Sequence, residues 1–249
     1  MYNSSMVEVT LEQESASFQN YSGSANILAG FVETICGLKL HQNTRNKWRY
    51  LMESMRVADD LIDSKSTHIA RDKLYTYVIE NLRNQPNSTK EDMEADRVID
   101  IIKQKLLSDL PINQKILFIT NLKSLFRITE KLKTEENGKK LATLTRLEGQ
   151  LTARMLLLVL PKENSSRAVT IAITRFCRFA NNVDSAIDMP MDHRGGKTKC
   201  DSTISNRFTM LVAAVPDIIS SVKHLKPGPK QILQMVDSGF KTVQGRNNQ

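Results

Sequence analysis

Residues 56–63 are RVADDLID, and they stand at the end of an apolar helical segment, with three carboxylates in the last five positions. On a helix, Asp59 and Asp63 share one face, with Cβ atoms ~5–6 Å apart. Two such charges repel by roughly 3 kcal/mol at an effective dielectric constant of about 20, and a bound cation would offset that cost. Mg2+ takes carboxylate oxygens and shares its other positions with phosphates. The alternative is a solvated acidic helix end, paired with Arg56 or Lys65.

The segment before this cluster has helical periodicity. Trp48, Leu51, Met52 and Met55 recur along one stripe, and Asp59 extends it. Carboxylates that extend an apolar stripe face a cavity more often than carboxylates on the opposite face. The same periodicity predicts helices over 25–38, 44–64, 70–82, 93–110, 114–132, 139–160, 166–188, 207–222 and 230–240.

Strand patterns are absent from the sequence, because no alternating apolar run is bounded by turn residues. We therefore expect an all-α protein with one helical domain over residues 23–249. Residues 1–22, rich in Ser, Asn and Glu, are expected to form a flexible arm. Pro190 biases the residue before it away from helix, so the helix over 166–188 is expected to end at about Asp188, with a loop over 189–203.

Composition narrows the function classes. Lys and Arg exceed Asp and Glu by eight, 35 against 27, in 249 residues with a pI near 9.4, which favours anionic partners. The basic residues are scattered and match no nucleic-acid-binding module, so no nucleic acid is expected. Three isolated cysteines support neither a disulfide framework nor a zinc site. The longest apolar stretch, 151–160, is too short to cross a bilayer, and the N-terminus lacks signal-peptide features. We expect a cytoplasmic protein without stable membrane insertion.

A second acidic cluster lies in residues 178–188, RFANNVDSAID. Asp184 and Asp188 repeat the four-residue spacing of the first cluster, and Arg178 and Asn181 fall on the same helical strip. A Gly-rich basic loop with Arg194 and Lys197 follows it. Two acidic strips in an all-helical chain favour a metal and phosphate site over two solvated helix ends.

Together the two clusters resemble the aspartate-rich motifs of the class I isoprenoid synthases, in the phytoene and squalene synthase-like branch that also contains terpene cyclases. In that family the motifs lie on facing helices and hold three magnesium ions, which bind and ionise an allylic diphosphate. Asp59 and Asp63 match the first DxxxD motif, and Asp184 and Asp188 match the second.

Two more positions carry the resemblance, which covers about residues 25–200. Arg56 matches the arginine before the first motif, and Gly149 matches a glycine that kinks the helix opposite the motifs. The resemblance implies a single-domain helical bundle with a central active-site cavity. It implies metal ligands at Asp59, Asp60, Asp63, Asp184 and Asp188, and substrate contacts at Arg56, Arg178, Asn181, Arg194 and Lys197. The alternative for Arg56 and Arg178 is that each neutralises its own aspartates.

The departures from the family pattern favour one reaction over another. Ala180 and Val183 stand where that branch usually has asparagine and arginine, and no tyrosine precedes Gly149 closely. The missing tyrosine counts against head-to-head coupling. We therefore expect a Mg2+-dependent terpene synthase, a carbon-oxygen lyase acting on a prenyl diphosphate, as a monomer or a homodimer. The alternatives are a head-to-head or chain-elongating prenyltransferase and a non-catalytic helical binding protein.

Overall fold

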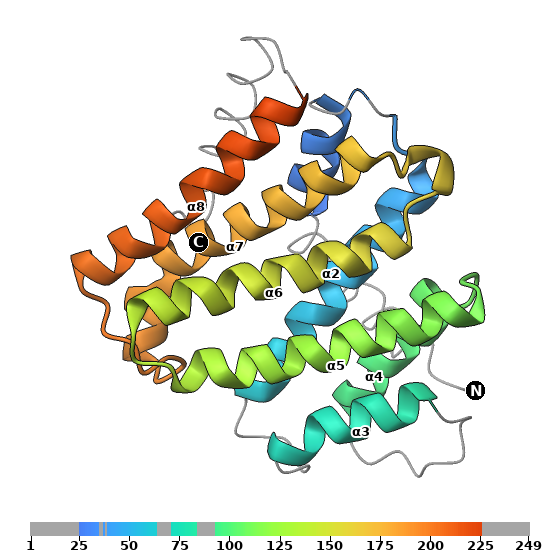
Figure 1. Ribbon diagram of the computed structural model, residues 1–249. Helices are drawn as coiled ribbons and strands as arrows, with labels where there is room; N and C mark the ends of the chain where they lie inside the picture. The colour runs from blue at the N-terminus through green and yellow to red at the C-terminus, as the bar shows by residue number, and fades with distance from the viewer. Residues whose placement is uncertain (1–24, 35–36, 38, 64–70, 84–92, 226–249) are drawn as a thin grey trace, which may run out of the picture.

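The computed structural model describes residues 25–34, 37, 39–63, 71–83 and 93–225, without the side chains of 58–63, 71–74, 93–94 and 222–225. In these ranges the chain forms helices and no strand (Figure 1). The prediction of an all-α protein is thereby confirmed. The expected arm over 1–22 and the expected helix over 230–240 lie outside the described residues.

Four long helices lie side by side in chain order (Figure 1): α5 (Ile112–Thr134), α6 (Gly138–Leu158), α7 (Arg167–Arg194) and α8 (Ile204–Leu225). Short connections make each helix antiparallel to the one before it. The side chain of Asn137 caps α6 by accepting hydrogen bonds from two backbone N–H groups of the first turn, and Ser166 caps α7 by accepting one. These caps satisfy donors that would otherwise be left unpaired at the helix starts.

The N-terminal half supplies a helix over 25–34, α2 (Gln42–Asp63), α3 (Arg71–Arg83) and α4 (Met93–Ile101). The prediction of one α-helix over 93–110 was wrong, because residues 102–107 form a π-helical turn. In an α-helix Ile102 and Leu107 would lie ~140° apart around the axis. The wider π turn, with hydrogen bonds from i to i+5, brings residues five apart close to one face, and both side chains are buried.

The main core is built by the helix over 25–34, by α2, α3 and α4 with the π-helical turn, and by α5, α6 and α7. Trp48 is fully buried, and its indole N–H donates to the carbonyl oxygen of Leu156 at 3.2 Å, which ties α2 to the end of α6. Phe31 stacks on Phe176 with ring centroids 4.0 Å apart, so the helix over 25–34 packs against α7. From its start near the end of α6, α2 runs behind α6 and α5 in the view of Figure 1.

The prediction that α7 ends at about Asp188 was wrong, because the helix continues through Pro190 to Arg194. Proline lacks an N–H group, so the carbonyl of Ala186 loses its usual helical partner. The side chain of Arg207 on α8 replaces that partner, with Nε donating to the Ala186 oxygen at 2.8 Å. The expected loop over 189–203 is correspondingly shorter, and Gly196, at φ 70°, takes the left-handed conformation just after the helix.

Helix α8 has an exposed apolar face, and its buried face combines the apolar residues Met210 and Ala214 with two polar ones. Asp217 and Ser221 are buried against the bundle. The exposed apolar residues are Ile204, Phe208, Leu211, Val212, Val215 and Ile219. Within the described ranges, no helix combines the length and the apolar character that crossing a membrane requires.

Candidate functional site

The acidic strip predicted from the sequence lies in the second half of α7. Asp184 is exposed and Asp188 is half-buried. Since α7 continues past Pro190, Asp192 lies one further turn along the same helix, and the three aspartates recur every four residues. Among the described side chains, no three His, Cys, Asp or Glu residues come close enough to hold a metal ion together. A metal site on this strip therefore needs ligands from elsewhere in the chain.

The first acidic cluster lies on the last turns of α2, which the structure describes to Asp63 as backbone. The side chains of Asp59, Asp60 and Asp63 lie outside the described residues. Arg56, one turn earlier, is exposed on α2.

The side chain of Asn181 points toward α6. Its Nδ2 donates to Oε2 of Glu148 at 3.2 Å, and Thr129 on α5 donates to the other carboxylate oxygen of Glu148 at 3.2 Å. Next to this contact, a Cβ added to Gly149 would lie 2.5 Å from the carbonyl oxygen of Cys177. Helices α6 and α7 can approach each other closely here because Gly149 has no side chain.

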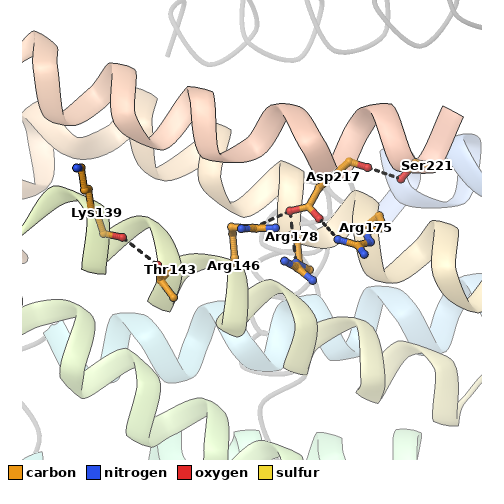
Figure 2. A network of polar contacts seen from close by, with 7 residues as sticks. All are labelled: Lys139, Thr143, Arg146, Arg175, Arg178, Asp217 and Ser221. Carbon is orange, nitrogen blue, oxygen red and sulfur yellow. Dashed lines mark hydrogen bonds and ion pairs between the residues drawn. The ribbon is translucent and has the colours of Figure 1, made fainter. Parts of the chain in front are cut away.

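Arg178 faces α8, where it joins a cluster of three arginines around one carboxylate (Figure 2). Asp217 Oδ2 accepts a hydrogen bond from Nε of Arg146 at 2.8 Å and lies 3.4 Å from Nε of Arg178. Asp217 Oδ1 accepts from Nη1 of Arg175 at 2.7 Å. The side chain of Asp217 is 0% exposed, while those of Arg146, Arg175 and Arg178 are 27%, 35% and 20% exposed. We call these four residues the arginine cluster.

The arginine cluster joins three helices, since α6 supplies Arg146, α7 supplies Arg175 and Arg178, and α8 supplies Asp217. Burial lowers the pKa of the Arg178 guanidinium from its usual range. Asp217 opposes that shift, while Arg146 and Arg175 add to it by repulsion between like charges. Charge repulsion among the arginines is thus present even with the carboxylate in place.

Two buried polar groups, one in the arginine cluster and one next to it, make no hydrogen bond. Asn182 is 0% exposed, and neither its Nδ2 nor its Oδ1 makes a hydrogen bond. The Nε of Arg178 is buried and makes no hydrogen bond either, although it lies within ion-pair distance of Asp217. Asn182 lies one helical turn beyond Arg178 on α7. Such unsatisfied groups commonly mark the place of a water or ligand.

The remaining predicted substrate contacts lie at the far end of α7. Arg194 is exposed, and its Nε donates to the carbonyl oxygen of Pro190 at 3.0 Å. Lys197 is exposed just after the helix. Sixteen residues separate Arg178 from Arg194, which corresponds to ~24 Å along the helix axis. The predicted basic contacts on α7 therefore occupy two separate places.

Sequence reasoning missed Asp192 and Asn182. It also missed three members of the arginine cluster, Arg146, Arg175 and Asp217. Asp217 could have been noticed as a single charge within the apolar run from Met210 to Ile219. A lone carboxylate in such a run needs a cationic partner when it is buried. The position of the partners on α6 and α7 follows from the packing of three helices, which no local pattern reports.

Comparison of the chain with protein-family models gave no match, and neither did comparisons with curated proteins and with solved structures.

Proposed function

We propose that the protein is a Mg2+-dependent terpene synthase that ionises an allylic prenyl diphosphate and releases diphosphate. The observation that carries the proposal is the aspartate ladder on α7 within an all-helical bundle, in which Asp184 and Asp188 lie one turn apart and Asp192 continues the row. The proposal includes a bundle of the isoprenoid synthase type with a central cavity.

The donor set of the ladder suits magnesium, because Mg2+ prefers carboxylate oxygens and retains positions for waters and phosphates. The ladder alone does not gather three ligands among the described side chains. We therefore assign the other ligands to Asp59 and Asp63 on α2, with Asp60 as an additional one. Mg2+ bound between the two helices would stabilise the negative charge that develops on the leaving diphosphate.

The chain's own cations and apolar side chains have separate tasks in this proposal. Arg56, Arg194 and Lys197 are exposed and would donate hydrogen bonds to phosphate oxygens. Water must be kept from an allylic cation, and buried apolar residues such as Phe31 and Met155 exclude it from the bundle interior. The amide nitrogen of Asn181 is engaged by Glu148 on α6, so its oxygen is the atom left for a substrate contact.

The experiment is an incubation of the purified protein with geranyl, farnesyl or geranylgeranyl diphosphate and Mg2+, with diphosphate release measured and the products separated by gas chromatography. The proposal predicts release of diphosphate and a product from one substrate alone. Addition of isopentenyl diphosphate tests for chain elongation, which would lengthen the product. If none of the three substrates loses diphosphate faster than in a blank without protein, the proposal is wrong.

Variants connect the activity with the two acidic clusters. Asp59→Asn and Asp184→Asn each remove one proposed oxygen ligand with little change in side-chain volume. We expect each to lower the rate of diphosphate release by at least about 100-fold, because metal-stabilised charge contributes several kcal/mol to such a step. Asp109→Asn, at an exposed aspartate in the turn before α5, is the matched control and should keep the parent rate.

A further inference from the structure

The arginine cluster carries more positive charge than its carboxylate balances. Three guanidinium groups surround one carboxylate, so the formal charge of the cluster is +2. Both oxygens of Asp217 are already engaged by the arginines. Among the described residues, Asp217 is the only carboxylate that forms ion pairs with Arg146, Arg175 or Arg178. The excess charge is therefore not neutralised within this part of the chain.

The guanidinium groups have donors to spare and are reachable. Each guanidinium has five N–H donors, and the hydrogen bonds to Asp217 use one from Arg146 and one from Arg175. Their side chains are 20–35% exposed, so a small ligand can reach them from solvent, whereas Asp217 behind them is not reachable. Asp217 thus holds three cationic side chains together from the inner side.

The unsatisfied groups give an independent sign of a missing partner. A buried polar group without a hydrogen bond is destabilising, and neither the Asn182 amide nor the Arg178 Nε makes one, although the Arg178 Nε lies 3.4 Å from Asp217 Oδ2. They lie one helical turn apart on α7, where Arg178 contacts Asp217 of α8. The Nδ2 of Asn182 lacks an acceptor, which an oxyanion supplies through a bound water, whereas the Oδ1 of Asn182 needs a donor such as that water.

We propose that Arg146, Arg175 and Arg178, held together by Asp217, bind a phosphoryl group that carries at least two negative charges. A dianion balances the charge of the cluster, whereas a single carboxylate leaves one positive charge over. A tetrahedral phosphate also accepts hydrogen bonds from several directions, as donors from α6 and α7 require, and guanidinium groups bind it in a bidentate manner.

This site is separate from the proposed metal site. At ~100° per residue, Arg175 and Arg178 lie ~180° and ~120° from Asp184 around the axis of α7, and Arg178 is ~15 Å along the axis from Asp188. Binding at the arginine cluster needs no metal ion, so it is independent of the proposed synthase activity.

The test is isothermal titration of the full chain with inorganic phosphate and, separately, inorganic diphosphate, in EDTA and at constant ionic strength set with chloride. We expect saturable binding of at least one of the two anions at one site per chain. Arg146→Gln should weaken it by at least about tenfold, since one of the three cations is lost. Arg154→Gln, which removes an exposed arginine from the same helix, should change it by less than about twofold.

Two results would overturn the inference: no saturable binding of either anion to the parent protein, or equal weakening by Arg146→Gln and Arg154→Gln. Circular dichroism checks the fold of each variant, and Arg146→Lys, which keeps the charge but loses the fork, replaces a variant that fails to fold. It should weaken binding less than tenfold but measurably. A chain that releases diphosphate with Mg2+ but binds neither anion in EDTA contradicts this inference alone. Anion binding without any prenyl diphosphate activity contradicts the proposed function alone.

Discussion

Helix α7 presents two charged surfaces that differ in their surroundings. Toward α8, Arg175 and Arg178 both form ion pairs with the fully buried carboxylate of Asp217. On the other side, Asp184 is exposed and Asp188 is half-buried, in a row of aspartates that gathers no third described ligand nearby.

The two surfaces of α7 should therefore respond differently to substitution, one mainly in stability and the other mainly in the proposed synthase activity. A buried carboxylate surrounded by arginines is required by the fold, because loss of either sign leaves uncompensated buried charge. An exposed row of like charges contributes little to stability, and its repulsion favours a bound cation. Substitution of Asp217 should therefore destabilise the protein, while substitutions on the aspartate row should lower the proposed synthase activity with little loss of stability.

The largest expected change in stability is for Asp217→Asn. The variant leaves three guanidinium groups around a neutral amide, so we expect the free energy of unfolding to fall by ~3–5 kcal/mol. Urea denaturation followed by circular dichroism measures it. Asp201→Asn, at an exposed aspartate 3.8 Å from His193, is the control and should lower stability by less than about 1 kcal/mol. A loss below about 1 kcal/mol for Asp217→Asn would remove the contrast between the two surfaces.

Gly149→Ala tests the close contact between α6 and α7. The added Cβ would lie 2.5 Å from the carbonyl oxygen of Cys177, so the helices must separate, at a cost of ~1–3 kcal/mol in stability. Gly30→Ala is the control, because a Cβ there has no neighbour within 4 Å. Alanine also favours a helix over glycine, so the control should be neutral or stabilising by up to ~1 kcal/mol. Equal thermal midpoints for the two variants would contradict the observed packing.

Arg207→Gln tests how α7 continues through its proline. The variant loses the hydrogen bond to the Ala186 carbonyl, and we expect a loss of ~1 kcal/mol in denaturant titrations. Pro190→Ala restores the backbone N–H that this carbonyl lacks. In that background the Arg207→Gln cost should drop below about 0.5 kcal/mol, whereas an unchanged cost would show that Arg207 acts in another way.

The smallest effect concerns two buried cysteines, Cys177 within α7 and Cys200 just after it. Burial raises the pKa of the Cys177 thiol to about 12, so the thiolate fraction at pH 8 is about one part in ten thousand. Burial, together with Asp201 and Glu135, also raises the pKa of Cys200. We expect alkylation of both thiols at pH 8 to be much slower in the native protein than in urea, measured by mass spectrometry. Equal rates would mean that α7 opens readily.

The sequence predicted most of the fold because helical periodicity is local. Residues 114–132 and 139–160 are helical within two residues of their predicted bounds, since an apolar stripe follows each helix and turn residues such as Pro111 and Asn137 precede them. Pro190 misled the prediction because its effect depends on Arg207, which is distant in the chain. The prediction also failed over Ile102–Leu107, because a π-helical turn brings residues five apart close to one face, whereas an α-helix does not.

The candidate site was predictable only in part, for a similar reason. Asp184 and Asp188 were found because their spacing is local, and Asp192 was missed because the helix was expected to end before it. Asp217 and Arg146 are 71 residues apart, and their contact exists only because α6 and α8 both pack against α7 and also contact each other. Long-range ion pairs of this kind leave no spacing pattern in one sequence.

A double-variant cycle on Mg2+-dependent diphosphate release tests the central claim that α2 and α7 build one metal site. Asp59→Asn and Asp188→Asn should each slow release by at least about 100-fold while the free energy of unfolding changes by less than about 0.5 kcal/mol. Because ligands of one metal cluster act as a unit, the double variant should be slower than either single variant by less than about tenfold. Single variants as fast as the parent, or two effects that multiply in full, would contradict the account.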